Sequence, residues 1–328
     1  MKPFAYYNPK DIADAVTVLG AREGGSFAIA GGTDLLGEIK NGYLAAERVV
    51  NLKAIKGLDR IRSGGSGLKL GSLVKLSAIA SDKKIRRDYL ALAQAAESVG
   101  SPQLRNMGTL GGNICQRPRC WYYRGEEYDC IRKGGGTCFA PGGRNKYHCI
   151  VEGGPCFIVH PSDVAVALRA LDASVTIQGN KGSREVSLDE FFVLPTADSM
   201  VENILKPGEL ITEVKVPKPV AGSGNCYLKF KERGSRDFAL VSAGVVIAMK
   251  GDTCTKASIV LGGVSPAPYR AAGAEAELAG KRLTAASLKA ACDAALADAD
   301  PLDENAYKID LAATMIKRAV LRASGVDI

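Results

Sequence analysis

The residues Ala30-Gly31-Gly32-Thr33-Asp34-Leu35 mark a change of pattern in the chain, and this first glycine turn decides the fold. Residues 26–30 before it are predicted to form a strand, and a helix is expected behind it. Paired glycines permit a positive φ and a close backbone approach, so consecutive N–H groups can converge on an anion. The helix N-terminus adds a favourable dipole. The same residues also fit a plain tight turn in which Thr33 or Asp34 caps the helix.

A second glycine turn, Asn106-Met107-Gly108-Thr109-Leu110-Gly111-Gly112-Asn113, again joins paired glycines to a hydroxyl and an amide side chain. Two such turns can clamp a pyrophosphate from both sides. Neither matches the dinucleotide fingerprint G-x-G-x-x-G or the phosphate loop G-x-x-x-x-G-K-[ST], and neither pattern occurs elsewhere in the chain. A nicotinamide-binding Rossmann site and a nucleotide triphosphatase are therefore disfavoured.

The cysteines are concentrated in one stretch. Six of the nine lie within the 42 residues from 115 to 156, here called the cysteine-rich segment. Because the N-terminus does not read as a secretory signal, such clustering favours metal ligation over disulfides. Periodicity is absent from residues 102–161, and so long a loop needs something other than a hydrophobic core to order it. A metal site would supply that order.

The rest of the chain has an α+β pattern. Helices are expected at residues 12–19, 86–99 and 163–171, and Pro217–Gly224 is the best linker candidate. Beyond the linker, strand-like runs at 227–230, 239–249 and 256–261 precede helix-like runs at 271–279, 285–297 and 305–323. Strands followed by helices indicate a compact α+β domain.

The two glycine turns together resemble the FAD-binding medium subunits of molybdenum hydroxylases, a family that includes carbon monoxide dehydrogenase, xanthine dehydrogenase and aldehyde oxidoreductases. The resemblance extends to Phe4-x-Tyr6-x-x-Pro9 and to Tyr227-Leu228-Lys229 with Arg233 and Ala239, so it covers nearly the whole chain. It implies an FAD-binding domain of the vanillyl-alcohol-oxidase (PCMH) type at residues 1–221, with an insert at 115–156. A carbon monoxide dehydrogenase flavoprotein C-terminal domain, with a three-stranded antiparallel sheet and three helices, would follow at 225–328.

The resemblance also assigns residues to the flavin. Backbone N–H groups of the two turns would hold the pyrophosphate. Asp163 matches the family's acidic residue near the ribityl and phosphate region, and Lys229 its basic residue facing the isoalloxazine. Alternatively, Asp163 only caps the following helix and Lys229 is a solvated strand residue. The cofactor-binding residues that the resemblance implies are Ala30, Gly31, Gly32, Thr33, Asp34, Leu35, Asn106, Thr109, Gly112, Asn113, Asp163 and Lys229.

Most members of that family lack the cysteine-rich segment, whereas this one resembles the insert of the periplasmic aldehyde oxidoreductase type. The 4-hydroxybenzoyl-CoA reductase medium subunit has a comparable insert, and such inserts bind a [4Fe–4S] cluster. The matching ligands are Cys120, Cys130, Cys138 and Cys156. Cys115 and Cys149 are interpreted as spare or buried thiols, with an exchange of Cys149 for Cys156 left open.

The residue chemistry agrees with a cluster. The gaps of nine, seven and seventeen residues do not fit the C-x₂-C pairs of structural zinc, whereas a loop can wrap a cluster with irregular spacing. The segment has seven Lys or Arg against four Asp or Glu, a net +3 that would favour an anionic cluster. Its glycines, at 134–136 and 142–143, can bring N–H groups near the sulfurs. The two histidines, His148 and His160, are expected to be structural, with a supporting hydrogen bond to the site as the alternative.

The resemblance therefore implies an electron-transfer subunit that carries FAD and a [4Fe–4S] cluster. The chain shows no Ser-His-Asp set, histidine pair or paired carboxylate, and an electron carrier needs none because its cofactors supply the chemistry. The resemblance implies a molybdopterin-binding large subunit, a small subunit with two [2Fe–2S] clusters and an external electron acceptor, with aldehyde oxidation as the expected reaction. The alternatives are a 4-hydroxybenzoyl-CoA reductase-like subunit, a stand-alone flavin oxidase and a zinc-stabilised binding module. The zinc-stabilised module would use the cysteine-rich segment to bind an acidic partner.

Charge and hydropathy limit the other classes. The net charge is +8, but Lys and Arg are scattered and aromatic residues make up only 6%, so nucleic-acid binding is not expected. No stretch approaches the roughly 18 apolar residues of a membrane span. A cytoplasmic location is expected, with export alongside a partner subunit as the alternative.

Overall fold

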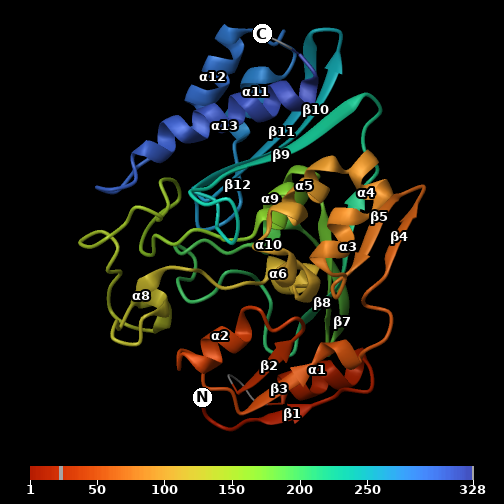
Figure 1. Cartoon of the computed structure of the whole chain (residues 1–328), viewed down its shortest axis with the longest axis vertical. Helices are drawn as coiled ribbons and strands as arrows, with labels where there is room; N and C mark the ends of the chain where they lie inside the picture. Colours follow the sequence, from red (N-terminus) through yellow and green to blue (C-terminus); the bar gives the residue numbers. More distant parts are fainter. Residues whose placement is uncertain (22–24, 327–328) are drawn as a thin grey trace.

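The computed structural model describes residues 1–21 and 25–326 as an elongated body built on three sheets. A small sheet near the N-terminus lies at one end, a five-stranded sheet lies in the middle, and the last sheet with its helices forms the other end (Figure 1). The cysteine-rich segment projects from one side, around helix α8. The α+β fold class is thereby confirmed.

The first sheet positions the first glycine turn. Its three strands, in the order β1 (Ala5–Tyr7), β3 (Arg48–Asn51) and β2 (Ser26–Ile29), are all parallel. Helix α1 (Ile12–Gly20) buries one apolar face against this sheet, as its spacing predicted, and Asp11 caps its first turn. Strand β2 leads through the turn into α2 (Leu35–Lys40), so the expected strand–turn–helix order is present.

The five-stranded sheet has the order β4-β5-β8-β6-β7, with every neighbouring pair antiparallel. Its core is closed by α5 and α9. The bounds are β4 (Ile61–Gly64), β5 (Gly67–Gly71), β6 (Ser174–Gly179), β7 (Gly182–Ser187), β8 (Leu210–Pro217), α3 (Leu76–Ser81), α4 (Lys83–Asp88), α5 (Leu90–Ser98), α9 (Asp163–Ala170), α10 (Leu188–Phe191) and the 3₁₀ turn η1 (Leu52–Ala54).

Two predictions of secondary structure are wrong here. The helix expected at residues 86–99 is two helices, α4 and α5, which are separated at Tyr89. The side chain of Asn225, from a distant strand, accepts a hydrogen bond from the backbone N–H of Ala91 at 2.7 Å. This bond occupies a free donor in the first turn of α5 and so stabilises a new helix start there. The stretch expected to lack regular structure contains α6 (Pro102–Met107), α7 (Leu110–Ile114), α8 (Trp121–Arg124) and η2 (Ile131–Lys133). These elements are too short to show an apolar period.

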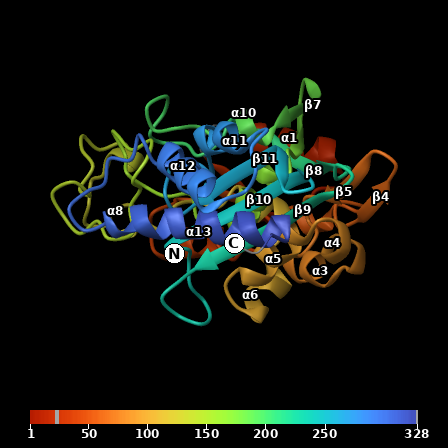
Figure 2. The ribbon, with the colours of Figure 1, turned by 90° about the horizontal axis from the view of Figure 1, so that it is seen from above.

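The C-terminal sheet has the order β12-β11-β10-β9 and is antiparallel throughout. Its bounds are β9 (Ser223–Phe230), β10 (Val241–Lys250), β11 (Thr253–Gly262) and β12 (Tyr269–Arg270), and its helices are α11 (Ala272–Leu278), α12 (Ala285–Ala295) and α13 (Tyr307–Ser324). The expected three strands and three helices are present, with β12 as a two-residue addition. All three helices lie on one side of the sheet (Figures 1 and 2). Residues 327–328 of the predicted domain lie outside the described residues.

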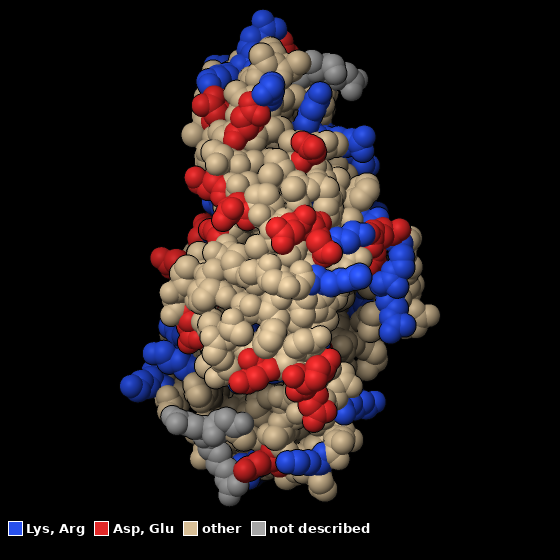
Figure 3. Space-filling model, turned by 90° about the vertical axis from the view of Figure 1, so that its left-hand side faces the viewer, with Lys and Arg blue, Asp and Glu red and all other residues tan. Residues whose placement is uncertain are grey.

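Within residues 1–21 and 25–326, no helix is both long and apolar enough to cross a bilayer. On the face in Figure 3, acidic and basic side chains are interspersed, and a broad area between them carries neither. The excess of positive charge therefore does not form one basic patch on that face.

Candidate cofactor sites

The two glycine turns touch each other through their backbones. A Cβ atom on Gly31 would collide with the carbonyl oxygen of Met107, so only glycine fits there. Gly32 has φ +69°, in the left-handed region. A Cβ on Gly112 would lie 3.1 Å from Thr109 Oγ1, a buried hydroxyl with no partner among the described residues. A backbone cradle with a free hydroxyl beside it suits a phosphate group.

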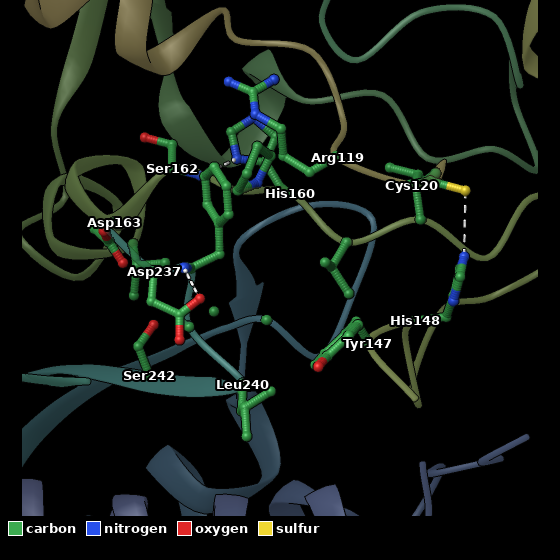
Figure 4. A pocket seen from close by; sticks show the side chains of 18 of the residues that line it. Arg119, Cys120, Tyr147, His148, His160, Ser162, Asp163, Asp237, Leu240 and Ser242 are labelled. Atoms are coloured by element: carbon green, nitrogen blue, oxygen red, sulfur yellow. Dashed lines mark hydrogen bonds between the residues drawn. The ribbon is translucent and has the colours of Figure 1, made fainter. Parts of the chain in front are cut away.

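Three cavities that share lining residues lie along these turns, and together we call them the FAD cleft, after the cofactor that the resemblance implies. The first, about 230 Å³, lies against β2 and the first turn. The second, about 520 Å³, shares Thr33, Asp34, Thr109, Gly112 and Gln116 with the first. The third, about 300 Å³, reaches the loop between β9 and β10 (Figure 4). Asp163, Arg119 and Phe238 line both the second and the third.

The structure brings most of the residues assigned to the flavin to this cleft. Ala30, Gly31, Gly32 and Leu35 line the first cavity, and Asn113 lines the second. Two of the assigned residues, Asn106 on α6 and Lys229 on β9, line none of the three.

Asp163 and Lys229 form a buried ion pair below the cleft. Lys229 Nζ lies 2.7 Å from Asp163 Oδ2, and the side chains are 3% and 5% exposed. Tyr227 donates its hydroxyl to Asp163 Oδ1 at 2.5 Å, and burial together with this carboxylate raises the pKa of Tyr227. Ser162 caps α9 instead, by accepting the N–H of Ala165. The pair fixes the carboxylate of Asp163 at the wall of the cleft.

Asp34 belongs to the first turn but faces the cysteine-rich segment. Its Oδ1 lies 2.7 Å from Arg119 Nη1 and 2.8 Å from Arg124 Nη2. Its Oδ2 accepts the backbone N–H of Arg117 at 2.8 Å. Both carboxylate oxygens are therefore held by the segment rather than presented to the cleft alone.

The four cysteines predicted as ligands line one small cavity, the thiol cavity. Cys120, Cys130, Cys138 and Cys156 share it with His148, whose Nε2 lies 3.3 Å from Cys120 Sγ (Figure 4). The neighbouring Cys156 thiol lowers the pKa of Cys138 below the usual value of a cysteine. Neither of the two spare thiols lines this cavity, since Cys115 lines the first cavity of the FAD cleft and Cys149 is buried elsewhere.

In the described part of the chain, no three Cys, His, Asp or Glu side chains converge closely enough for a single metal ion. A zinc ion needs its ligands within about 2.3 Å of one point. A four-iron cluster places each thiolate on a different iron, so its four sulfurs stand around a larger body. The four thiols line one cavity of about 10 Å³, and among the described residues they form no site for a single ion.

Backbone N–H groups lie near the sulfurs of Cys120 and Cys138, but they belong to residues other than the expected glycines. The amides of Tyr122 and Tyr123 hydrogen-bond to Cys120, although burial still raises the pKa of its thiol to about 11. The amides of Ala140 and Phe157 hydrogen-bond to Cys138. Three of the five glycines expected in this role are engaged otherwise, since the N–H groups of Gly134, Gly135 and Gly143 donate to backbone carbonyl oxygens.

The basic side chains of the segment, which were expected to favour an anionic cluster, mostly pair with carboxylates instead. Arg117, Arg119 and Arg124 pair with Asp34, Glu38 and Glu202 outside the segment. Only Arg132 approaches a predicted ligand, with Nη1 at 4.0 Å from Cys156 Sγ. Four of the seven basic residues of the segment thus pair with these acidic residues of the FAD domain, whereas Lys146 pairs with Glu232 of the C-terminal domain.

The comparisons with known proteins agree with this architecture. The family model "FAD binding domain in molybdopterin dehydrogenase" matches residues 2–219, and "CO dehydrogenase flavoprotein C-terminal domain" matches residues 225–323. The chain belongs to the family of FAD-binding medium subunits of molybdenum hydroxylases, and it is an oxidoreductase subunit.

Individual relatives include the aldehyde oxidoreductase FAD-binding subunit of Escherichia coli strain K12, which is 35% identical over 95% of both chains. The carbon monoxide dehydrogenase medium chain of Hydrogenophaga pseudoflava is 28% identical over 97% of this chain and 96% of its own length. A solved structure of carbon monoxide dehydrogenase from that organism matches with TM-score 0.79 and 29% identity over 99% of both chains. Quinoline 2-oxidoreductase from Pseudomonas putida 86 shares the fold, with TM-score 0.75 and 22% identity.

Proposed function

We propose that the chain carries FAD and a [4Fe–4S] cluster and passes electrons from a molybdenum-containing large subunit to an external acceptor. The observation that carries the cluster is the shared lining of the thiol cavity by Cys120, Cys130, Cys138 and Cys156. Four thiolates are the ligand set of such a cluster, which supplies one-electron chemistry when it is bound.

The FAD would lie along the FAD cleft. Backbone N–H groups of residues 31–33 and the hydroxyl of Thr109 would hold the pyrophosphate. The remaining residues assigned above stay part of this proposal, although Asn106 and Lys229 would act from outside the cleft. Lys229 would hold the Asp163 carboxylate in a fixed orientation beside the flavin.

The FAD cleft and the thiol cavity share a wall. Cys120, His148 and Ile158 line both the third cavity of the cleft and the thiol cavity. A flavin and a cluster bound there would be neighbours across a single layer of side chains. This favours a cluster that exchanges electrons with the flavin over one that only pins the loop.

Aldehyde oxidation is favoured by the relative at 35% identity, whose printed name is an aldehyde oxidoreductase subunit. Other relatives act in complexes named for carbon monoxide and nicotinate, so the substrate would be chosen by the large subunit. A small subunit with two [2Fe–2S] clusters would complete a heterotrimer. The domain limits of 1–221 and 225–328 belong to the proposal, as does a cytoplasmic location with joint export as the alternative.

Anaerobic purification of the full chain tests this function. We expect flavin absorption bands on a broad iron–sulfur absorption, with one FAD, four irons and four sulfides per chain. Flavin bands alone would overturn the cluster and leave a flavoprotein subunit or oxidase. A colourless protein that contains zinc would instead support a binding module.

A further inference from the structure

The loop that would grip the FAD pyrophosphate and the cysteine-rich segment are joined at a single side chain, Asp34. Three donors meet its carboxylate, namely Arg119 Nη1 at 2.7 Å, Arg124 Nη2 at 2.8 Å and the backbone N–H of Arg117 at 2.8 Å. Asp34 is 18% exposed, and the two guanidinium side chains are 26% and 17% exposed. Charge pairs so far removed from water are screened less than surface pairs.

All three donors lie within four residues of the predicted cluster ligand Cys120. Arg119 directly precedes Cys120, and α8 begins directly after it. The backbone N–H of Arg124 donates to Cys120 O at 2.9 Å, so one turn of helix connects this thiol to a guanidinium that binds Asp34. Ligation of Cys120 would therefore fix the backbone from which both arginine side chains extend toward Asp34.

A second group of contacts runs beside the first. Tyr123 donates its hydroxyl to Glu38 Oε1 at 2.9 Å, which packs α8 against the helix that follows the first turn. Glu202 binds Arg117 at 2.8 Å and Arg132 at 2.8 Å. Arg132 in turn lies 4.0 Å from Cys156 Sγ. The first and last predicted ligands, Cys120 and Cys156, are therefore both connected to the first glycine turn through chains of contacts that end at Asp34.

We propose that Asp34 is a positioning residue whose carboxylate locks the first glycine turn to the cysteine-rich segment, so that ordering of this segment by its cluster tightens the binding of FAD. The inference rests on the proposed function. The segment has only short helices, and metal ligation would supply most of its order. Coupling between two binding sites is reciprocal, so bound FAD favours the cluster-loaded segment to the same extent.

If Asp34 instead contacted FAD directly, its replacement would have a different effect on FAD affinity. A carboxylate pointing at a pyrophosphate would repel it. Removing that charge would then leave FAD affinity unchanged or raise it. Loss of the arginines would expose the carboxylate to the phosphates, whereas in our proposal loss of either partner has the same consequence.

The experiment measures the FAD dissociation constant of the full chain by flavin fluorescence, in cluster-loaded and chelator-stripped forms. In the loaded protein, we expect Asp34→Asn to raise it about tenfold and the Arg119→Gln/Arg124→Gln pair to raise it by a similar factor. Combining all three changes should add less than about twofold, because they break one connection. In the stripped protein, the wild type should already bind more weakly, and Asp34→Asn should cost less than about threefold.

A second readout and two further variants accompany the measurement of FAD affinity. Trp121, the only tryptophan in the chain, follows Cys120 directly, so its fluorescence reports on order in the segment. Arg62→Gln, which breaks an exposed ion pair with Glu213 elsewhere in the FAD domain, is the matched control and should leave the dissociation constant unchanged. Arg124→Gln alone removes one of the three donors and should raise it by only about threefold, with the fold intact.

An unchanged or lower dissociation constant for Asp34→Asn would overturn the proposal. So would equal penalties in the loaded and stripped forms, or FAD affinity that survives loss of both arginines. Failure of the proposed function has a separate signature, an iron-free wild-type protein. In that case, comparison of Asp34→Asn with the arginine pair still decides whether Asp34 positions the turn.

Discussion

The first glycine turn and the cysteine-rich segment differ in how each would form the cofactor site proposed for it. The turn is shaped by its backbone: Gly31 lies against the carbonyl of Met107, and Gly32 has a positive φ. The segment has little regular structure, and its site consists of side chains, four thiols around a cavity. A site built from the backbone is disrupted by adding an atom, whereas a site built from side chains is lost by removing one.

The largest effect should come from removing one thiol. Cys156→Ser or Cys138→Ser is expected to lower the iron content from four per chain to nearly none, because oxygen is a poor replacement for a thiolate ligand. Iron and sulfide assays with the absorption spectrum measure it. Cys149→Ser and Cys115→Ser are the matched controls and should keep their iron, since neither thiol lines the thiol cavity. Loss of iron in Cys149→Ser would reverse the ligand assignment.

The corresponding change in the turn is Gly31→Ala. The added methyl group would collide with Met107 O and push the two turns apart, so we expect the FAD dissociation constant to rise about a hundredfold. Flavin content after purification and a fluorescence titration measure this effect. Gly37→Ala, six residues on, is the control because a Cβ there meets nothing within 4 Å. Equal FAD binding by both variants would contradict a backbone cradle.

A third change tests the buried pair beneath the cleft. Lys229→Met leaves the Asp163 carboxylate buried without its partner cation, and the free energy of unfolding should fall by about 3 kcal/mol. Chemical denaturation measures the loss. In the double variant with Asp163→Asn the unpaired charge is gone, so stability should recover in part. Additive losses would mean that the two residues act separately.

The smallest effect is a pH dependence at His160, which lines the third cavity. Burial lowers its pKa to about 3, well below the usual value of 6.5. Between these values the unfolded chain takes up a proton that the folded chain excludes, so stability must fall as pH falls below about 6.5. We expect a loss of about 2 kcal/mol between pH 7 and pH 5 from this group.

The measurement is chemical denaturation at the two pH values, with His160→Asn for comparison. The variant lacks the titrating ring, so its loss between pH 7 and pH 5 should be smaller by about that amount. A pH dependence identical to that of the wild type would show that the ring is protonated in the folded state.

Local chemistry explains which predictions could be made from the sequence. Paired glycines, a threonine and an amide have few uses at a strand–helix junction, so the two turns and the family could be identified from short stretches. The apolar stripe of α1 and the three strands and three helices of the C-terminal domain were likewise evident, because each element carries its own period. The positions of the four thiols could be chosen only by resemblance.

What the sequence could not provide are the contacts between distant residues. Asp34 looks like a cofactor residue or a helix cap, yet its partners Arg119 and Arg124 lie 85 and 90 residues further along the chain. The break between α4 and α5 depends on Asn225, and the charge of the cysteine-rich segment is directed at Asp34, Glu38 and Glu202.

The sequence by itself thus determined the family and the two glycine turns, because these depend on residue type and near neighbours. Only the tertiary structure decided where the thiols, the arginines and the turns meet. Ion pairs and hydrogen bonds form over about 3 Å in space, whatever the separation along the chain. The connection through Asp34, which joins the two kinds of site, is therefore a property of the fold.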